Sequence, residues 1–393
     1  MSRIFSFIVV LCFSSLLNHA HAFVSNPSSS SALELVYLQD GTTLTTYSVD
    51  RQTLSATQVG QPFMLPMSTF IMLTPSLNGR LLYIQGTDSS QKQHLWVFAT
   101  DASGVPQNPP LQALEVNGLF GFALDPGVNF AYAVVGLLNS QNQLLFSIER
   151  YVVDSNTGKL SSPAIVATYP PNGPCPEGSY GASLGMSGFS PSGKTLYDGW
   201  YCSYRGGVDA TYYARTINSQ TGILGPDVEV YQWTNNTEGY DNVTFINNKI
   251  IDFSIPNPYG EGFNSLSIYP VVPNSKTPLL RCTASMLEAC GYSIGDLVHP
   301  SGKYIFFTLN YYNEQIASVD FANRKLVNTG HFIPYQVSRF SPDGTIVYAV
   351  SVGSVTYDWE IFGFNPDNGD ITTTGGVIHA PAITDTFWPV LRQ

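Results

Sequence analysis

The chain contains the stretch Phe340-Ser341-Pro342-Asp343-Gly344-Thr345-Ile346-Val347-Tyr348, in which two apolar segments flank a Pro-x-Gly turn. Close copies of this pattern begin at Leu73, Leu124, Phe189 and Val298. Proline and glycine favour a tight turn, and the apolar residues on both sides of it favour strands. Each copy therefore predicts a β-hairpin.

The spacing of these hairpins predicts a repeat architecture. A degenerate copy at Phe245–Ile251 carries Asn247 and Asn248 instead of Pro-x-Gly, and asparagine also tolerates turn geometry. With this copy included, the turns recur about every 53 residues. Four-stranded units of about 40 to 50 residues are typical of propeller blades. The chain from Ala32 onward holds close to seven such units.

A second turn signal completes the repeat. An aspartate or asparagine that starts a polar or glycine-containing turn follows the third expected strand in most units, at Asp50, Asp101, Asp154, Asn218, Asp320 and Asn365. Each unit then consists of an inner strand, a Pro-Gly turn, a second strand, a loop, a third strand, an Asx turn and an outer strand. No segment shows a sustained helical period, so we expect few helices.

The two ends of the repeat region are complementary. The first unit has nothing before Leu35 that could form its inner strand, whereas Thr386–Leu391 is a spare strand at the C-terminus. A C-terminal strand that joins the first blade would close the ring and remove exposed sheet edges. We therefore predict an all-β, seven-bladed β-propeller of four-stranded antiparallel blades, with six or eight blades as alternatives.

The repeat resembles the seven-bladed propellers of the lactonase and YVTN-repeat group. The resemblance rests on Ser190–Tyr197, on Ser341–Tyr348 and on the Asp-x-x-Thr-Gly turn at Asp154–Gly158, and it covers most of the chain after the leader. It implies the propeller fold and, as an alternative to a binding function, a hydrolase or isomerase that acts on a lactone or sugar acid. Fold alone does not fix the activity.

One segment extends the resemblance to candidate catalytic residues. Tyr204-Arg205-Gly206 looks like the Asn-Arg-Gly segment of lactonase-like propellers, but Met186 and Ser187 stand where a Glu-Ile pair commonly opens the preceding inner strand. The resemblance thus leaves Arg205 as the electrophile-stabilising candidate, and the acids near it are Asp198 and Asp241.

The N-terminus predicts export. Arg3 precedes an apolar run from Ile4 to Leu17, and Ala20-His21-Ala22 has the form that a signal peptidase recognises. We expect residues 1–22 to be a signal peptide, 23–31 a flexible leader and 32–393 a single propeller domain. No other apolar run approaches the length of a membrane span. The expected location is extracytoplasmic: extracellular, periplasmic or at the cell surface.

Four cysteines remain after the expected signal peptide. Their spacing matches no zinc pattern, so we expect disulfides and neither a metal nor a cofactor. In the expected topology Cys175 precedes the inner strand of blade four and Cys202 ends its second strand, which are neighbouring points of a hairpin. Cys282 and Cys290 bracket one blade-to-blade crossing. Local pairing, Cys175 with Cys202 and Cys282 with Cys290, is therefore predicted.

The composition excludes several partners. The chain has 393 residues, of which only 11% are charged, and a formal net charge of −11. With 17 Lys and Arg against 28 Asp and Glu, it lacks the positive charge that phosphate backbones require, so we expect no nucleic acid. We expect a monomer.

The longest expected loops lie on one face of the ring, in blades four to six. They are the segments 169–184, 201–211, 233–241, 254–264 and 282–295. Long loops in a compact fold are often functional, and aromatic side chains among carboxylates and amides suit a sugar ring or a protein partner. The candidate binding residues are Trp200, Tyr204, Arg205, Trp233, Tyr240, Tyr259, Tyr292 and Tyr311.

The main hypothesis is a secreted, non-catalytic propeller that binds a carbohydrate, a small molecule or a protein on this face. The lactonase-type enzyme is the alternative, and a pure scaffold has no sequence feature of its own. A further alternative for the aromatic residues is that they only pack between blades. Two Gly-x-Ser-x-Gly matches, at Gly181 and Gly291, lie next to expected inner strands and lack the strand-turn-helix context of a nucleophile elbow.

Overall fold

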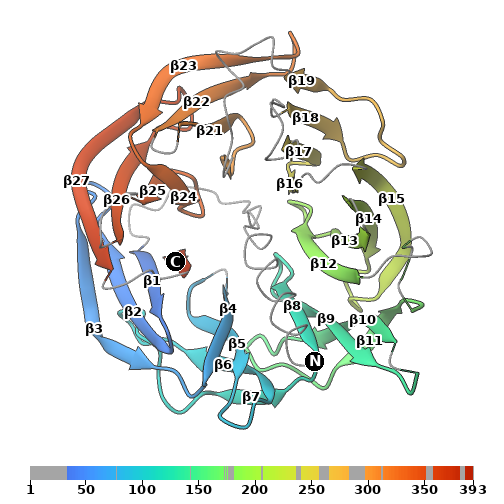
Figure 1. Ribbon diagram of the computed structural model, residues 1–393. Helices are drawn as coiled ribbons and strands as arrows, with labels where there is room; N and C mark the ends of the chain where they lie inside the picture. The colour runs from blue at the N-terminus through green and yellow to red at the C-terminus, as the bar shows by residue number, and fades with distance from the viewer. Residues whose placement is uncertain are drawn as a thin grey trace.

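The computed structural model describes residues 33–392, apart from 77, 142, 172, 174, 176–180, 205–206, 236–239, 256–264, 283–296, 311–312, 351–356 and 381–385. These described residues form β-strands and no helix, in seven four-stranded sheets. The sheets are arranged as blades around a ring (Figure 1). The predicted seven-bladed β-propeller is therefore confirmed, and the alternatives of six or eight blades are excluded.

Blades one to four follow the chain in order. From the inner to the outer strand, blade one consists of β28 (Thr386–Arg392), β1 (Leu33–Asp40), β2 (Thr43–Val49) and β3 (Ala56–Met64). Blade two consists of β4 (Thr69–Pro75), β5 (Leu81–Thr87), β6 (Gln93–Ala99) and β7 (Gln112–Glu115). Blade three consists of β8 (Leu119–Leu124), β9 (Phe130–Leu138), β10 (Leu144–Val152) and β11 (Ala164–Thr168). Blade four consists of β12 (Gly181–Phe189), β13 (Thr195–Tyr204), β14 (Gly207–Ile217) and β15 (Leu224–Asn235).

Blades five to seven complete the ring. Blade five consists of β16 (Tyr240–Ile246), β17 (Lys249–Ile255), β18 (Ser265–Pro270) and β19 (Leu280–Cys282). Blade six consists of β20 (Leu297–Val298), β21 (Tyr304–Asn310), β22 (Asn313–Asp320) and β23 (Lys325–Ile333). Blade seven consists of β24 (Gln336–Phe340), β25 (Ile346–Val350), β26 (Tyr357–Phe364) and β27 (Ile371–Ala380). Within the described part, no helix is long and apolar enough to cross a membrane.

The C-terminal strand closes the ring. β28 pairs antiparallel with β1, from Leu33 opposite Arg392 to Gln39 opposite Thr386, and so provides the inner strand of blade one. Figure 1 shows the red C-terminal strand beside the blue first strand. The predicted closure is therefore confirmed, and blade one combines the two ends of the described chain.

The two predicted turn types form as the sequence indicates. The side-chain oxygens of Asp50, Asp101, Asp154, Asn218, Asp320 and Asn365 accept hydrogen bonds from backbone N–H groups two or three residues later. In the degenerate hairpin, Asn247 and Asn248 have φ angles of 47° and 58°, in the left-handed region that asparagine tolerates. These turns lie on one side of the ring, which we call the turn face. The opposite side, with the second-to-third-strand and blade-to-blade connections, is the long-loop face.

Seven apolar clusters stabilise the ring, each between two neighbouring blades. Between blades one and two, for example, Leu35 and Tyr37 pack with Leu82 and Ile84, and all four side chains are fully buried. Comparable clusters join each of the remaining six pairs of neighbouring blades. Because the blades are covered on both faces, strand residues on both sides are apolar, which accounts for the low charge content.

The tyrosine of the repeat links blades by a hydrogen bond. Its hydroxyl donates to the carbonyl oxygen of the glycine in the next blade's Asx turn, in the pairs Tyr37 with Gly104 (2.7 Å), Tyr83 with Gly158 (2.8 Å) and Tyr132 with Gly222 (2.9 Å). Gly158 has a φ of 71°, and a Cβ there would lie 2.0 Å from Leu81 Cδ1. The turn therefore requires glycine both for its backbone conformation and for the approach of the neighbouring blade.

Tyr83→Phe is expected to lower the free energy of unfolding by about 1–2 kcal/mol, because the buried carbonyl of Gly158 loses its donor. Urea unfolding followed by fluorescence measures the effect. Tyr47→Phe, at a partly exposed position on β2, is the matched control and should change stability less. Equal midpoints for Tyr83→Phe and the wild type would contradict an energetic role for this contact.

One predicted loop is wrong. Residues 201–211 were expected to form a loop, but β13 and β14 pair continuously from Thr195 opposite Thr216 to Tyr204 opposite Gly207. Tyr204 and Gly207 are the last pair of this hairpin, so most of the segment is strand and not loop. The first Gly-x-Ser-x-Gly match lies in the inner strand β12 itself, at Gly181–Gly185, which gives its serine strand geometry and no nucleophile elbow.

Candidate functional site

The candidate residues were predicted on the long-loop face of blades four to six. Arg205, Tyr259, Tyr292 and Tyr311 lie outside the described residues. For four other candidates the structure gives a backbone position only: Tyr204 ends β13, Trp233 is in β15, and Tyr240 and Asp241 begin β16. Along one register line of blade four, Tyr201 is opposite Ala210, and Ala210 is opposite Trp233.

A disulfide joins Cys175 to Cys202, as predicted. It connects the crossing from blade three to blade four with the second strand of blade four, and the two Cα atoms are 5.3 Å apart. Cys282, at the end of β19, is buried, whereas Cys290 lies outside the described residues, so the second pairing stays a prediction. The first crosslink restrains the chain beside the candidate residues of blade four.

Trp200 lies in the core rather than on a binding surface. Its side chain is 1% exposed and packs edge-to-face with Phe146 and Tyr169, with ring centroids 5.4 and 5.1 Å away. Gly173, with a φ of 55°, covers the indole so closely that a Cβ would lie 2.5 Å from it. Trp200 therefore follows the alternative in which the aromatic residues only pack between blades. The alternation of side chains along β13 turns it toward blade three.

Asp198 belongs to a buried polar cluster that includes one arginine the sequence analysis did not select. Its carboxylate is fully buried and accepts hydrogen bonds from Arg215 Nε, at 3.3 and 3.2 Å, and from the Tyr169 hydroxyl. Arg215 Nη2 also donates to the Tyr169 hydroxyl at 2.8 Å and lies 3.5 Å from Asp227. These hydrogen bonds hold Tyr169, at the start of the crossing into blade four, against β13 and β14. The Asp198 carboxylate does not face solvent.

Burial dominates the electrostatics of this cluster. It raises the pKa of Asp198 above its ordinary value, and Arg215 opposes that change. Burial also raises the pKa of Tyr169, with Asp198 as the second cause. Asp198 therefore has the surroundings of a structural ion pair and not those of an accessible general base.

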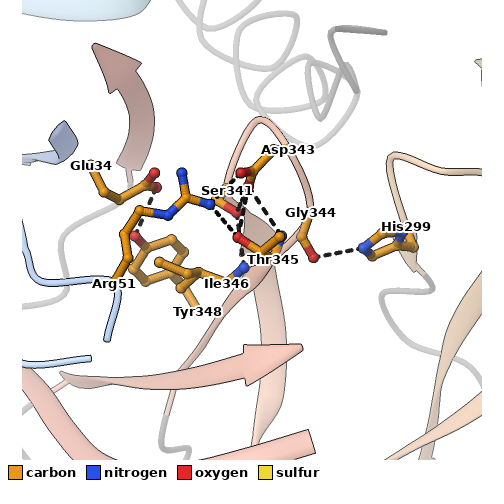
Figure 2. Close-up of polar contacts among 9 residues, drawn as sticks. All are labelled: Glu34, Arg51, His299, Ser341, Asp343, Gly344, Thr345, Ile346 and Tyr348. Carbon is orange, nitrogen blue, oxygen red and sulfur yellow. Dashed lines mark hydrogen bonds and ion pairs between the residues drawn. The ribbon is translucent and has the colours of Figure 1, made fainter. Parts of the chain in front are cut away.

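A second polar cluster lies on the turn face, where blades seven and one meet. Arg51, in the Asx turn of blade one, pairs with Asp343 and contacts Thr345 in the Pro-Gly turn of blade seven (Figure 2). On the other side of the Arg51 side chain from Asp343, the Tyr348 hydroxyl donates to Glu34 Oε1 at 3.0 Å. We call Glu34, Arg51, Asp343 and Tyr348 the closure cluster, since it spans the seam where the ring closes.

The closure cluster takes the place of the tyrosine-to-glycine contact that joins blades one and two, two and three, and three and four. At the glycine position of blade one stands Leu54, with a φ of 56°, and Tyr348 bonds to Glu34 instead. Glu34 is fully buried, and burial, together with the nearby Asp343, raises its pKa to about 8. Glu34 is therefore largely protonated at neutral pH.

His299 joins blade six to blade seven next to this cluster. Its Nε2 donates to the Gly344 carbonyl at 2.7 Å, and its Nδ1 lies 2.8 Å from Ser301 Oγ (Figure 2). The ring is fully buried, and burial lowers its pKa to about 4. Both ring nitrogens are engaged within the protein, so this neutral histidine is a structural link between two turns. Among the described residues, no group of three or more His, Cys, Asp or Glu side chains could hold a metal ion.

The chain is similar in fold to several solved structures. A protein provisionally named a 6-phosphogluconolactonase, from Bacteroides fragilis NCTC 9343, matches with a TM-score of 0.58 and 14% identity, over 93% of this chain and 100% of that chain. Prolyl oligopeptidase B from Galerina marginata matches with a TM-score of 0.55 and 10% identity, over 96% of this chain and 53% of that chain. A puromycin hydrolase matches with a TM-score of 0.51 and 13% identity, over 93% and 57%.

No protein-family model and no curated protein matches the chain. The chain spans the whole length of the protein named as a 6-phosphogluconolactonase and just over half the length of the prolyl oligopeptidase and of the puromycin hydrolase. At these identities the likeness establishes the propeller fold, and the fold agrees with the resemblance seen in the repeat. It does not carry an activity over to this chain.

Proposed function

We propose that this chain is a secreted β-propeller that binds a carbohydrate, a small molecule or a protein on the long-loop face of blades four to six, without catalysing a reaction. The observation that carries this proposal is the Cys175–Cys202 disulfide, which restrains the crossing into blade four beside the candidate binding residues. A restrained surface loses less conformational entropy when it binds a ligand. The disulfide is also compatible with an oxidising, extracytoplasmic compartment.

The strand lengths of blade four support the same surface. β13 has 10 residues and β14 has 11, whereas the corresponding strands of blade two, β5 and β6, have 7 each. The additional pairs, up to Tyr204 opposite Gly207, extend blade four on the long-loop face. A paired hairpin is a more rigid support for binding residues than an irregular loop of the same length.

The aromatic residues at this end of blade four are compatible with recognition. Tyr201 is partly exposed, and its hydroxyl lies 3.2 Å from the Tyr212 hydroxyl with the rings edge-to-face. Tyrosine provides rigid apolar area and a polar tip, which suits sugar rings and protein side chains alike. The buried ion pair of Asp198 argues against this residue as the acid of a lactonase-type site.

The test combines a binding screen with an activity screen on the oxidised protein. A glycan array and a protein pull-down report binding, and a panel of sugar lactones reports hydrolysis. Tyr292→Ala with Tyr311→Ala should weaken binding at least about tenfold, because aromatic anchors carry most of the energy of such surfaces. Cys175→Ala with Cys202→Ala should weaken it as well while leaving strand content unchanged. Phe332→Ala, at a side chain 62% exposed on the outer strand β23, is the control.

Lactone turnover that disappears in Arg205→Ala would contradict the proposal and favour the enzyme. Equal loss of binding in Phe332→Ala and in the loop variants would also contradict it, since the effect would then be nonspecific. Binding that survives both the double tyrosine variant and the double cysteine variant would place the ligand on another surface and contradict the proposal.

A further inference from the structure

The hairpin of β9 and β10 in blade three ends in leucines on the long-loop face. Leu138 is opposite Leu144, and Leu137 is opposite Leu145. We call these four residues the leucine tip. Leu137 is 52% exposed and Leu138 is 67% exposed, and the other two are half-buried. Single exposed apolar residues are common on protein surfaces, whereas adjacent ones indicate an interaction site.

The leucine tip is apolar on both faces of the hairpin. Leu138 and Leu144 face blade four, and Leu144 packs against the apolar cluster between blades three and four. Leu137 and Leu145 face blade two, and a Cβ built on Gly118 would lie 3.4 Å from Leu137 Cδ2. These contacts cover the base of the tip, and the side chains of Leu137 and Leu138 stay in contact with solvent.

The turn at the end of this hairpin does not require leucines beside it, because blade two has the same turn. There the Asp88 N–H donates to the Lys92 carbonyl at 2.9 Å, and the Asp88 carboxylate accepts bonds from the N–H groups of Ser90 and Lys92. In blade three the Asn139 N–H donates to the Gln143 carbonyl at 2.9 Å. Asn139 Oδ1 accepts the two corresponding N–H bonds.

The strands beside the two turns also have the same register. In blade two, Thr87 is opposite Gln93 and Gly86 is opposite His94, at the positions where blade three has its leucine tip. The fold therefore accepts polar residues and glycine at these positions. Exposed leucines are unfavourable in water, and they contribute hydrophobic free energy when another surface covers them.

The chemistry of the tip favours an apolar surface as its partner. Leucine has neither a hydrogen-bonding group nor an aromatic face, which are the features that bind sugar rings. From Val128 to Ile148 the chain contains no charged residue and no histidine. An apolar groove on a protein matches a narrow, uncharged projection of this kind, because it can cover both faces of the hairpin.

Charge around the tip distinguishes a protein groove from a lipid surface and from a second copy of the chain. Among the described residues at this end of the flanking blades, blade two contributes Asp88, Lys92 and Glu115, and blade four contributes Asp209. This excess of acid would repel an anionic bilayer. A symmetric dimer would bring the same acidic groups of both copies together. Basic residues at the border of a groove would complement them.

We propose that the leucine tip inserts into an apolar groove, bordered by basic residues, on a protein partner. This inference goes beyond the proposed function, because blade three lies outside the surface of blades four to six and the partner is assigned as a protein. The two surfaces adjoin, since Leu144 and Cys175 of the disulfide pack against the same cluster.

Photo-crosslinking tests this inference, with p-benzoyl-L-phenylalanine in place of Leu138 as the probe, in the culture medium of the organism that produces the chain. The captured protein is identified by mass spectrometry, purified, and titrated against the oxidised chain by isothermal titration calorimetry. Leu137→Thr with Leu138→Thr should weaken its binding at least about tenfold, because buried apolar area is lost. An increase from about 50 to about 500 mM NaCl should also weaken it, by screening the charges.

The matched control is Val152→Thr with Ile165→Thr, two exposed side chains elsewhere in blade three, and it should bind like the wild type. If the thermal transition shows that the double leucine variant does not fold, Leu138→Thr alone replaces it. Four outcomes would overturn the inference: no protein is captured, the probe captures lipid or a second copy, the leucine variant binds like the wild type, or salt strengthens binding.

Tyr292→Ala with Tyr311→Ala separates this site from the proposed function. Weaker binding of the captured protein in the leucine variant alone would support the leucine tip and count against the surface of blades four to six. Weaker binding in the tyrosine variant alone would support that surface and overturn this inference.

Discussion

Glu34→Gln is expected to stabilise the protein at pH 8 by on the order of 4–5 kcal/mol and to change its stability little at pH 5. In the folded protein, burial raises the pKa of Glu34 from its ordinary value of 4.5 to about 8. The stability associated with the protonated carboxyl is fully present below pH 4.5 and is lost as the pH rises toward 8. Glutamine has the shape of the protonated acid, cannot ionise, and still accepts the hydrogen bond from Tyr348.

The measurement is the free energy of unfolding of the wild type and of Glu34→Gln in urea at several pH values, and the difference between the two is compared. His299 has the opposite behaviour: burial lowers its pKa to about 4, so it removes stability as the pH falls from 6.5. Subtracting the two profiles cancels this contribution. Glu115→Gln, at an exposed glutamate paired with Lys92, should show no gain between pH 5 and 8. A difference that does not grow over this range would contradict the assigned protonation of Glu34.

Arg215→Met is expected to destabilise the protein by about 3–5 kcal/mol, because it leaves the fully buried Asp198 without its cation. Chemical unfolding of the variant gives this value directly. Asp198→Asn combined with Arg215→Met removes both charges and should recover a large part of the loss, since an uncompensated charge, rather than a missing contact, is the main cost.

Arg150→Met is the control for this pair, because Arg150 is partly exposed and bonds to the Thr221 carbonyl on the surface. A loss below about 1 kcal/mol in Arg215→Met would mean that the buried pair contributes no more than a surface ion pair. Equal losses in the single and double variants would show that packing, and not charge, determines the effect.

The architecture was predictable because its signals are local and repeat. A Pro-x-Gly turn and an Asx turn each depend on a few adjacent residues, and their regular spacing determines the number of blades. The role of the C-terminal strand followed from the missing inner strand of blade one. The purpose of the tyrosine in the repeat was not predicted, since its partner, the turn glycine of the next blade, lies 67 to 90 residues away.

The residues of blade four show where sequence reasoning stops. The segment 201–211 is rich in glycine and polar residues, which favour a loop. In the structure the end of β13 pairs with the start of β14, and β14 pairs with β15, so the segment is a hairpin. Trp200, just before that segment, was predicted to be a binding residue and is instead in the core. Arg215 was missed, although a signal existed: Asp198 is opposite Tyr213, so Arg215, two positions further, shares its side of the sheet.

The sequence contained only a weak indication of the closure cluster. Glu34 is the one charged residue within the apolar run from Leu33 to Leu38, and a charge at a core position indicates a paired or protonated group. Its partner Tyr348 lies 314 residues away, and the two meet only because the ring closes. The candidate binding residues depend on side-chain positions at the long-loop face, which the backbone pattern does not define.

Hydrogen–deuterium exchange with and without the ligand identified on the array tests the central claim most directly. The proposed function predicts that protection appears at the long-loop face of blades four to six, including the end of the β13–β14 hairpin around residues 201–209. The turn face, with the closure cluster of Figure 2, should exchange at the same rate in both states. Protection confined to the turn face, or to blades one to three, would contradict the proposal.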